Sequence, residues 1–307
     1  MGRVAGPLRL MGAAIDGRDG GSRAPITIRG GELRPVDHVL PVASAQVKSA
    51  ILLAGLACGA SVREPARSRD HTERMLRAMG ARLAERDGTL VLSPTAGLDP
   101  VDVDVPGDLS AAAFPLVAAS LVPGSEVILE GVGVNPTRSG VLDVLRAMGA
   151  SVEERPRRSV GPEPVADLVV RAAPLVATEI RGELALRSLD ELVVIAVAAA
   201  FAAGTTRIRD AAELRVKESD RISRVAKGLR ALGVAVEEHP DGLDVTGGRP
   251  RGPAVVDATG DHRVAMAFAV AGLAMGGEGE VRVEGAESVR SSWPAFFEDL
   301  RALRVPG

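Results

Sequence analysis

The pattern of apolar and polar positions repeats along the chain. One sequence motif, in which helically spaced apolar residues are followed by a glycine, occurs four times. Its glycines are Gly12, Gly80, Gly149 and Gly233. The steps between these glycines are 68, 69 and 84 residues. Glycine suits the left-handed conformation that ends many helices, so each motif predicts the end of an amphipathic helix. The sequence therefore predicts an internal repeat of about 70 residues.

Each repeat contains further elements. Two alternating segments joined by a turn follow the amphipathic helix, as in Arg82–Glu85 and Thr89–Leu92, and they predict a β-hairpin. Half a repeat earlier lies an Ala-rich helix that is apolar on nearly all sides, which predicts burial, and a short strand follows it. We expect these buried helices at Val47–Cys58, Ala111–Leu121, Leu192–Ala203 and Val264–Met275. The pattern indicates an α/β protein.

The repeats are unequal at the two ends of the chain. The first begins inside its amphipathic helix, at about Gly2–Met11, and the last stops after its amphipathic helix without a hairpin. We therefore expect a chain that starts part-way through its fold.

Composition narrows the class of protein. The 307 residues fit two domains, and a net charge of −3 argues against nucleic-acid binding. No apolar run is long enough to cross a bilayer and no signal peptide is recognisable, so we expect a cytoplasmic protein. Cys58 is the only cysteine, which excludes an internal disulfide and favours a small core residue. No metal-ligand spacing, phosphate-binding loop or dinucleotide motif occurs, so we expect no metal and no cofactor.

Small polar clusters precede the predicted buried helices. They are 44–46, 108–110, 188–191 and 261–263. Ser and Asp are good helix N-caps, and capping alone explains Asp108 and Ser110 about as well as a ligand does. Capping explains Arg263 less well, because a cation in the first turn opposes the helix dipole. An anion held at this helix start would account for it.

The densest charged segment is Glu213–Arg221, just before an amphipathic helix. The ordinary explanation is a solvated helix start with local ion pairs. The segment nevertheless uses Lys217, one of only three lysines. In a similar segment before another helix, we expect Asp70–Arg74 and Glu73–Arg77 as surface ion pairs. Taken together, the clusters favour an anionic small ligand.

At these residues the chain resembles the family of 5-enolpyruvylshikimate-3-phosphate (EPSP) synthases. The resemblance runs along the whole chain, and RVKESDR (215–221) and DHRVAM (261–266) together are highly specific. SAQVKSA (44–50) and RDHTE (69–73) resemble the bacterial branch of the family. It implies the enolpyruvyl transferase fold, in which repeated βαβαββ units form two domains. The first would be residues 1–107, about one and a half of three repeats. The second would be 108–307, three repeats lacking strands supplied by an N-terminal segment.

The resemblance also implies an activity. EPSP synthases transfer the enolpyruvyl group of phosphoenolpyruvate to the 5-hydroxyl of shikimate 3-phosphate and release phosphate, in the shikimate pathway to chorismate and aromatic amino acids. The family uses no metal or cofactor and is usually monomeric. Its small-molecule substrates are both anions, and guanidinium groups suit their carboxylates and phosphates.

Site residues carry over by position in the motifs. The catalytic candidates are Asp190, Glu218, Lys217 and His262, with Asp190 and Glu218 matching the acid–base roles. Shikimate 3-phosphate would contact Ser44, Gln46, Arg69, Asp190 and Lys217. Phosphoenolpyruvate would contact Gln46, Arg221 and Arg263.

The chain also departs from the family pattern. The opening Lys-Ser-x-Ser-x-Arg and Gly-Asn-x-Gly-Thr motifs are absent, and Ser291 stands where many relatives carry Lys. We therefore expect this chain alone to be inactive. Two alternatives stay open: the sister enzyme that acts on UDP-N-acetylglucosamine, and a non-catalytic remnant. RVKESDR and SAQVKSA favour shikimate 3-phosphate.

Overall fold

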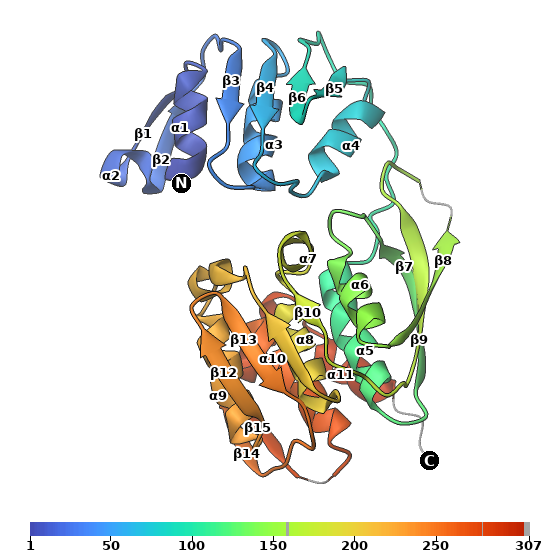
Figure 1. Cartoon of the computed structure of the whole chain (residues 1–307). Coiled ribbons are helices and arrows are strands. Elements are labelled where there is room, and N and C mark those ends of the chain that lie inside the picture. The colour runs from blue at the N-terminus through green and yellow to red at the C-terminus, as the bar shows by residue number, and fades with distance from the viewer. Residues whose placement is uncertain (158–159, 278, 304–307) are drawn as a thin grey trace. The chain divides into compact units, whose positions relative to one another are not determined.

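The computed structural model describes residues 1–157, 160–277 and 279–303, which form two compact units (Figure 1). Unit 1 comprises Met1–Val105 with residues 160–163, and unit 2 comprises the other described residues from Pro106 onward. We expected 160–163 to belong with the second domain. They belong to unit 1, where the Asp104 amide donates to the Val160 carbonyl (2.8 Å) and His71 Nδ1 lies 2.9 Å from Glu163 Oε1.

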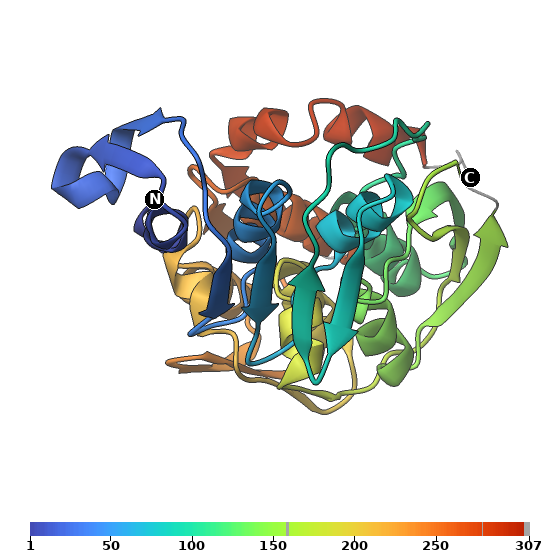
Figure 2. The same ribbon diagram turned by 90° about the horizontal axis from the view of Figure 1, so that it is seen from above.

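Unit 1 contains one whole βαβαββ repeat. Its sheet has the order β3-β4-β6-β5, in which β3 and β4 are parallel and the other neighbours are antiparallel. Figure 2 shows these four strands side by side, with α3 and α4 over one face. The elements of the repeat are β3 (Val36–Val39), α3 (Ala45–Ala54), β4 (Ala60–Arg63), α4 (His71–Ala78), β5 (Leu83–Arg86) and β6 (Thr89–Leu92).

The segment before this repeat is simpler. Helix α1 (Gly2–Leu10) packs against α3, and its last turn leads into a two-stranded antiparallel sheet. That sheet consists of β1 (Ala14–Gly17) and β2 (Arg23–Arg29), with the short helix α2 (Arg18–Gly21) between them.

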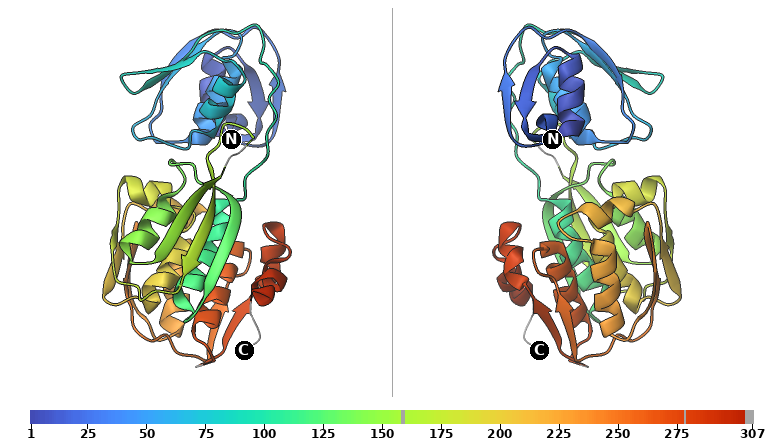
Figure 3. Two further views of the ribbon diagram at one scale, coloured as in Figure 1. Left: turned by 90° about the vertical axis from the view of Figure 1, so that its right-hand side faces the viewer. Right: turned by 90° about the vertical axis from the view of Figure 1, so that its left-hand side faces the viewer.

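Unit 2 contains three sheets that lie outside its buried helices (Figure 3). The first sheet is β7-β9-β8, with β7 (Glu126–Gly133), β8 (Ser151–Arg157) and β9 (Val165–Arg171). The second is β10-β11-β13-β12, with β10 (Glu179–Ile180), β11 (Thr205–Ile208), β12 (Ala235–His239) and β13 (Gly242–Thr246). The third is the parallel pair β14 (Ala254–Asp257) and β15 (Val281–Glu284).

Three Ala-rich helices form the centre of unit 2. They are α5 (Leu109–Leu121), α8 (Leu192–Phe201) and α10 (His262–Ala274), and each contacts the other two. Their small side chains permit this close approach. The result is near-complete burial: nine successive residues of α8, from Leu192 to Ala200, are at most 2% exposed. The prediction of buried helices is confirmed here. No helix among the described residues combines the length and the apolar character needed to cross a membrane.

The remaining helices of unit 2 are amphipathic or short. Residues 212–216 and 286–291 form 3-10 turns. The helices are α6 (Gly140–Ala147), α7 (Glu183–Arg187), α9 (Arg221–Ala231) and α11 (Phe296–Ala302).

Helix α3 of unit 1 differs from the expectation. It ends at Ala54, whereas the sequence predicted a helix to Cys58, and Leu53 is 54% exposed. Ile51 and Leu52 are fully buried against the core of unit 1. The helix is therefore buried on one side only, because its described neighbours within unit 1, which include α1, β4 and the start of α4, do not surround it.

The repeated glycines end helices as predicted. Gly12, Gly80, Gly149 and Gly233 follow α1, α4, α6 and α9, and their φ angles are 102°, 85°, 86° and 74°. A side chain would be strained at such angles, which explains why the motif keeps glycine at this position.

We predict that Gly228→Ala destabilises unit 2. Alanine normally stabilises a helix interior relative to glycine by about 1 kcal/mol. A Cβ at Gly228 of α9, however, would lie 2.3 Å from Cζ of Phe268 in α10. Overpacking of this kind costs about 1–3 kcal/mol, so the midpoint of urea unfolding should fall.

The matched control is Gly2→Ala at the start of α1, where a Cβ would lie 3.5 Å from the Cβ of Ser22, an ordinary van der Waals contact. This variant should be as stable as the parent chain or more stable. Equal or greater stability of Gly228→Ala would contradict the prediction.

Candidate functional site

In unit 2, the starts of helices α8, α9 and α10 carry most of the candidate residues. Arg221, the first residue of α9, is 1% exposed. Its Nε donates to Asp261 Oδ2 (2.9 Å) and its Nη2 donates to Asp261 Oδ1 (3.3 Å). The Arg221 guanidinium also lies 2.6 Å from Glu218 Oε2 and 3.8 Å from Asp190 Oδ1. The explanation of this segment as a solvated helix start is therefore wrong for Arg221.

Asp261 joins α9 to α10. It is fully buried and caps α10, since Oδ1 accepts from the amides of Arg263 (3.1 Å) and Val264 (3.4 Å). The Ser219 hydroxyl donates to its Oδ2 (2.8 Å). Burial raises the pKa of Asp261, but the hydrogen bonds and charge of Arg221 outweigh it and hold the pKa below the usual range. The group is therefore a carboxylate that fixes both helix starts.

Lys217 and Asp190 lie beside this pair. Lys217 Nζ is 2.9 Å from Glu213 Oε1 and 3.8 Å from Asp190 Oδ1. Arg263 Nη1 donates to the backbone oxygen of Asp190 (3.3 Å). The side chains of Lys217, Asp190 and Arg263 are 26%, 15% and 16% exposed, so each reaches the surface of unit 2. The structure thus brings the predicted site residues of unit 2 together.

His262 is the first residue of α10. Partial burial and the positive charges of Arg263 and Arg221 lower its pKa below that of an ordinary histidine. The imidazole is therefore neutral at neutral pH and offers one nitrogen donor and one acceptor.

A second buried network was not predicted. Glu191 precedes α8 with a side chain that is 0% exposed, and Arg138 Nη1 donates to both of its carboxylate oxygens (2.9 and 3.0 Å). Ser110, in the first turn of α5, donates to Glu191 Oε1 (2.5 Å). The available signal was Glu191, an acid directly before an apolar helix. Arg138 lies 53 residues away and carries no local sign of this contact.

In unit 1, the remaining candidates lie at the starts of α3 and α4. Ser44 caps α3 by accepting from the Val47 amide (3.4 Å), and its own amide donates to Glu64 Oε1 (3.2 Å). Ser68, next to Arg69, donates through its hydroxyl to the same oxygen (2.5 Å). Glu64 therefore links the segments that carry Ser44 and Arg69. Gln46 lies exposed in the first turn of α3.

Lys48 explains why one expected surface pair is absent. It is 1% exposed, and its Nζ lies 2.8 Å from Glu64 Oε2 and 2.6 Å from Glu73 Oε1. The expected Glu73–Arg77 surface pair is wrong, since Glu73 is 3% exposed and Arg77 donates to the Leu83 carbonyl (3.1 Å). A buried ammonium needs counter-charges, and this need draws Glu73 inward. The expected pairing of Asp70 with Arg74 is found at 2.8 Å, but it is not the surface pair that was predicted, because the Asp70 side chain is only 7% exposed.

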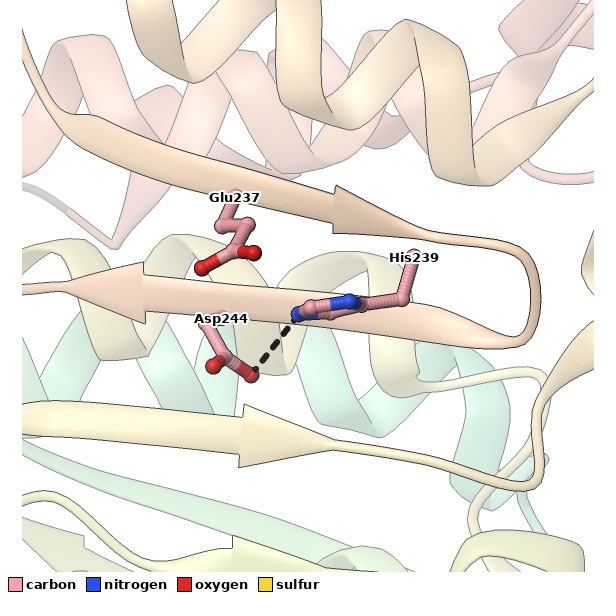
Figure 4. Close-up of side chains that lie close together, drawn as sticks. All are labelled: Glu237, His239 and Asp244. Atoms are coloured by element: carbon pink, nitrogen blue, oxygen red, sulfur yellow. Dashed lines mark ion pairs between the residues drawn. The ribbon is translucent and has the colours of Figure 1, made fainter.

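Among the described residues, Glu237, His239 and Asp244 bring three possible metal-ligand atoms within 4.8 Å of one another (Figure 4). His239 Nε2 lies 3.6 Å from Asp244 Oδ1. That same oxygen accepts from Arg209 Nη1 (2.6 Å), whose hydrogen bond holds the pKa of Asp244 low. The guanidinium already neutralises the carboxylate and would repel a metal ion, so we assign these residues to an ion-pair cluster on β12 and β13.

Comparison with known proteins decides the family. A sequence model described as EPSP synthase (3-phosphoshikimate 1-carboxyvinyltransferase) matches residues 1–300. The chain belongs to the EPSP synthase family. A 3-phosphoshikimate 1-carboxyvinyltransferase of Gloeobacter violaceus is 55% identical over 98% of this chain and 70% of its own length. One from a Synechococcus species is 52% identical over 100% of this chain and 69% of its own length.

Solved structures agree with this assignment. An EPSP synthase from Acinetobacter baumannii matches with a TM-score of 0.88 and 39% identity, over 99% of this chain and 70% of that chain. The enolpyruvyl transferase NikO from Streptomyces tendae matches with a TM-score of 0.77 at 20% identity, which shows a shared fold alone. The predicted enolpyruvyl transferase fold is confirmed.

We predict that Asp261→Asn strongly destabilises this EPSP synthase family member. The substitution leaves the buried Arg221 guanidinium without its counter-charge, which costs about 3–5 kcal/mol in comparable buried pairs. Urea unfolding at neutral pH measures the loss. The matched control is Asp257→Asn, because Asp257 is 64% exposed and pairs with Arg224 at the surface. It should cost much less, and a similar cost for both would contradict the prediction.

The same pair has a defined pH dependence. Because folding lowers the pKa of Asp261, its stabilisation is fully present above the ordinary aspartate pKa of about 3.9 and is lost as the pH falls further. Asp261→Asn should therefore remove part of the acid-side dependence of the unfolding free energy. An unchanged dependence would contradict the assignment.

We predict that His262 titrates below the ordinary histidine pKa of about 6.5. The Arg263→Gln substitution removes a nearby positive charge and should raise the titration midpoint. NMR titration of the His262 ring protons measures this change. Arg224→Gln on α9 is the control, since Arg224 pairs with Asp257 and should leave the midpoint unchanged. A midpoint unaffected by Arg263→Gln would be inconsistent with this cause.

Proposed function

We propose that this chain carries the site of a 3-phosphoshikimate 1-carboxyvinyltransferase, which transfers the enolpyruvyl group of phosphoenolpyruvate to the 5-hydroxyl of shikimate 3-phosphate. One observation carries the proposal: Lys217, Arg221 and Arg263 converge beside Asp190 at the starts of three helices, in a member of the EPSP synthase family. Helix N-termini and cations together favour anionic ligands, and both substrates are anions.

The cations differ in what they can offer phosphoenolpyruvate. Arg263 reaches the surface of unit 2, and one hydrogen bond of its side chain, to the Asp190 backbone oxygen, leaves further N–H donors for a carboxylate or phosphate. Arg221 is buried, and its Nε and Nη2 are engaged by Asp261 and Glu218. Glu218 is 46% exposed, so its side chain has room to rotate away when an anion approaches Arg221.

On unit 2, shikimate 3-phosphate is assigned to Lys217 and Asp190, an ammonium that suits a phosphate or hydroxyl and a carboxylate that accepts from a hydroxyl. The substrate roles of Ser44, Gln46 and Arg69 stay predictions from the family resemblance.

The proton transfers fit the two carboxylates. In the addition step the 5-hydroxyl oxygen bonds to C2 of phosphoenolpyruvate while C3 gains a proton. In the elimination step C3 loses a proton and the C2–O bond to phosphate breaks. We assign Asp190 to accept the hydroxyl proton and Glu218 to exchange the proton at C3, because both carboxylates lie within 4 Å of the Arg221 guanidinium.

The cations also stabilise the reaction itself. Negative charge on the carboxylate and phosphate of the tetrahedral intermediate lies where Lys217 and Arg263 can offset it. Neutral His262 can donate one hydrogen bond at the same helix start without adding charge. The ammonium, the guanidinium and the imidazole therefore contribute different donors to one site.

Substrate binding tests the proposal. Calorimetry should detect binding of phosphoenolpyruvate in the presence of shikimate 3-phosphate. Arg263→Gln should weaken phosphoenolpyruvate roughly 10- to 100-fold, the range for losing one charge-assisted contact, with a smaller effect on shikimate 3-phosphate. Any phosphate release that requires both substrates should fall with the same variant.

The matched control is Arg171→Gln. Arg171 pairs with Glu126 on the sheet β7-β9-β8 and should leave both affinities unchanged. Absence of binding of either substrate, or equal weakening by both variants, would overturn the proposal.

A further inference from the structure

We infer that Arg138 is a positioning residue for the reaction: it occupies the buried Glu191 carboxylate and thereby keeps Arg263 available to phosphoenolpyruvate. The inference rests on the proposed function, since it concerns the ligand of Arg263. The family resemblance assigned no role to Arg138.

Glu191 is unusual because its carboxylate is buried at the start of a helix that it does not cap. The residue occupies the N-cap of α8, yet its side chain caps no amide of that helix. The carboxylate is 0% exposed and lies among side chains from other elements of unit 2. A buried carboxylate that is not used for capping requires cationic partners, because desolvation of an unpaired charge is costly.

Among the described residues, two guanidinium groups are near enough to supply that charge. Arg138 Nη1 donates to both carboxylate oxygens, at 2.9 and 3.0 Å. Its Nη2 donates to the Ser110 hydroxyl, which in turn donates to Glu191 Oε1. Arg263 Nη1 is 3.9 Å from the same Oε1, beyond hydrogen-bond distance. Arg138 is thus the bonded partner and Arg263 the distant one.

Electrostatic interactions stabilise the ion pair between Arg138 and Glu191. Burial by itself lowers the pKa of its guanidinium, but the charge and hydrogen bonds of Glu191 outweigh it and raise the pKa further above its usual value. The Asp108 carboxylate, 3.9 Å from Arg138 Nη2, adds to the effect. Arg138 therefore stays protonated and bound to Glu191.

Loss of Arg138 would change the partner of Glu191. Within the described part of the chain, the next guanidinium is that of Arg263, and a shift of about 1 Å would close the 3.9 Å separation to a bonded ion pair. An Arg263 drawn to the buried carboxylate would turn its donors inward, away from the surface. Removing the Glu191 charge as well should release Arg263, so the second substitution should reverse the effect of the first.

The test is a double-substitution cycle on phosphoenolpyruvate affinity, measured by calorimetry with shikimate 3-phosphate present. Arg138→Gln should raise the Kd of phosphoenolpyruvate roughly 3- to 30-fold, the range for residues that act through a neighbour. The Kd of shikimate 3-phosphate should change much less. Combining Arg138→Gln with Glu191→Gln should restore most of the phosphoenolpyruvate affinity.

A ligand-free readout accompanies the cycle. The NMR signal of the Arg263 side-chain Nε–H should shift in Arg138→Gln and return in the double variant. The control is Arg155→Gln, which breaks an exposed pair with Glu153 and should move neither readout. If Arg138→Gln does not fold, Arg138→Lys keeps a charge without the planar donor fork and should give an intermediate loss.

The outcomes separate this inference from the proposed function. No binding of phosphoenolpyruvate by the parent chain would contradict the proposed function. Binding by the parent chain with an unchanged Kd in Arg138→Gln would overturn the inference alone. So would equal losses in the single and double variants, because that result indicates a purely structural role.

Discussion

The arrangement of unit 2 depends on one buried ion pair, Arg221 with Asp261. A guanidinium that is 1% exposed is tolerated only when its charge and its N–H donors are satisfied. Asp261 meets this need and also caps α10 and accepts from Ser219. Because Asp261 performs these tasks together, the start of α9 cannot shift without disturbing the start of α10. Ser219 of the segment before α9 also bonds Asp261, so this constraint limits the movement of the neighbouring Lys217 and Glu218.

The charges of unit 2 are arranged by depth. The fully buried carboxylates Asp261 and Glu191 are bonded to Arg221 and Arg138, while Arg263 and Lys217 reach the surface. These buried carboxylates at the helix starts stabilise guanidinium groups that would otherwise oppose the helix dipoles. This arrangement permits several cations to lie close together, which an anion-binding surface requires and which mutual repulsion would otherwise prevent.

Local patterns in the sequence predicted local structure well. The glycine-terminated helices, the hairpin β5–β6, and the buried helices α5, α8 and α10 all follow from periodicity and turn residues. Arg263 does lie in the first turn of α10, as predicted, while an anion at that helix start stays a prediction. These features depend on residues only a few positions apart, and the rules for spacing and capping describe such residues directly.

Charge pairs distant in sequence could not be predicted in this way. Arg221 and Asp261 are 40 residues apart, Arg138 and Glu191 are 53 apart, and Lys48 and Glu64 are 16 apart. The i,i+4 rule even selected the wrong partner for Glu73, because it cannot recognise that Lys48 is buried. Burial decides which charges must pair, and burial is a property of the assembled fold.

The contact between Gly228 and Phe268 has a consequence for dynamics. It presses the middle of α9 against α10, and the Arg221–Asp261 pair joins the starts of the same two helices. Two attachments along one pair of helices prevent either from hinging about a single point. Helices α9 and α10 should therefore open as one cooperative unit in hydrogen exchange, so that Lys217, Glu218 and Arg263 share one timescale of local unfolding.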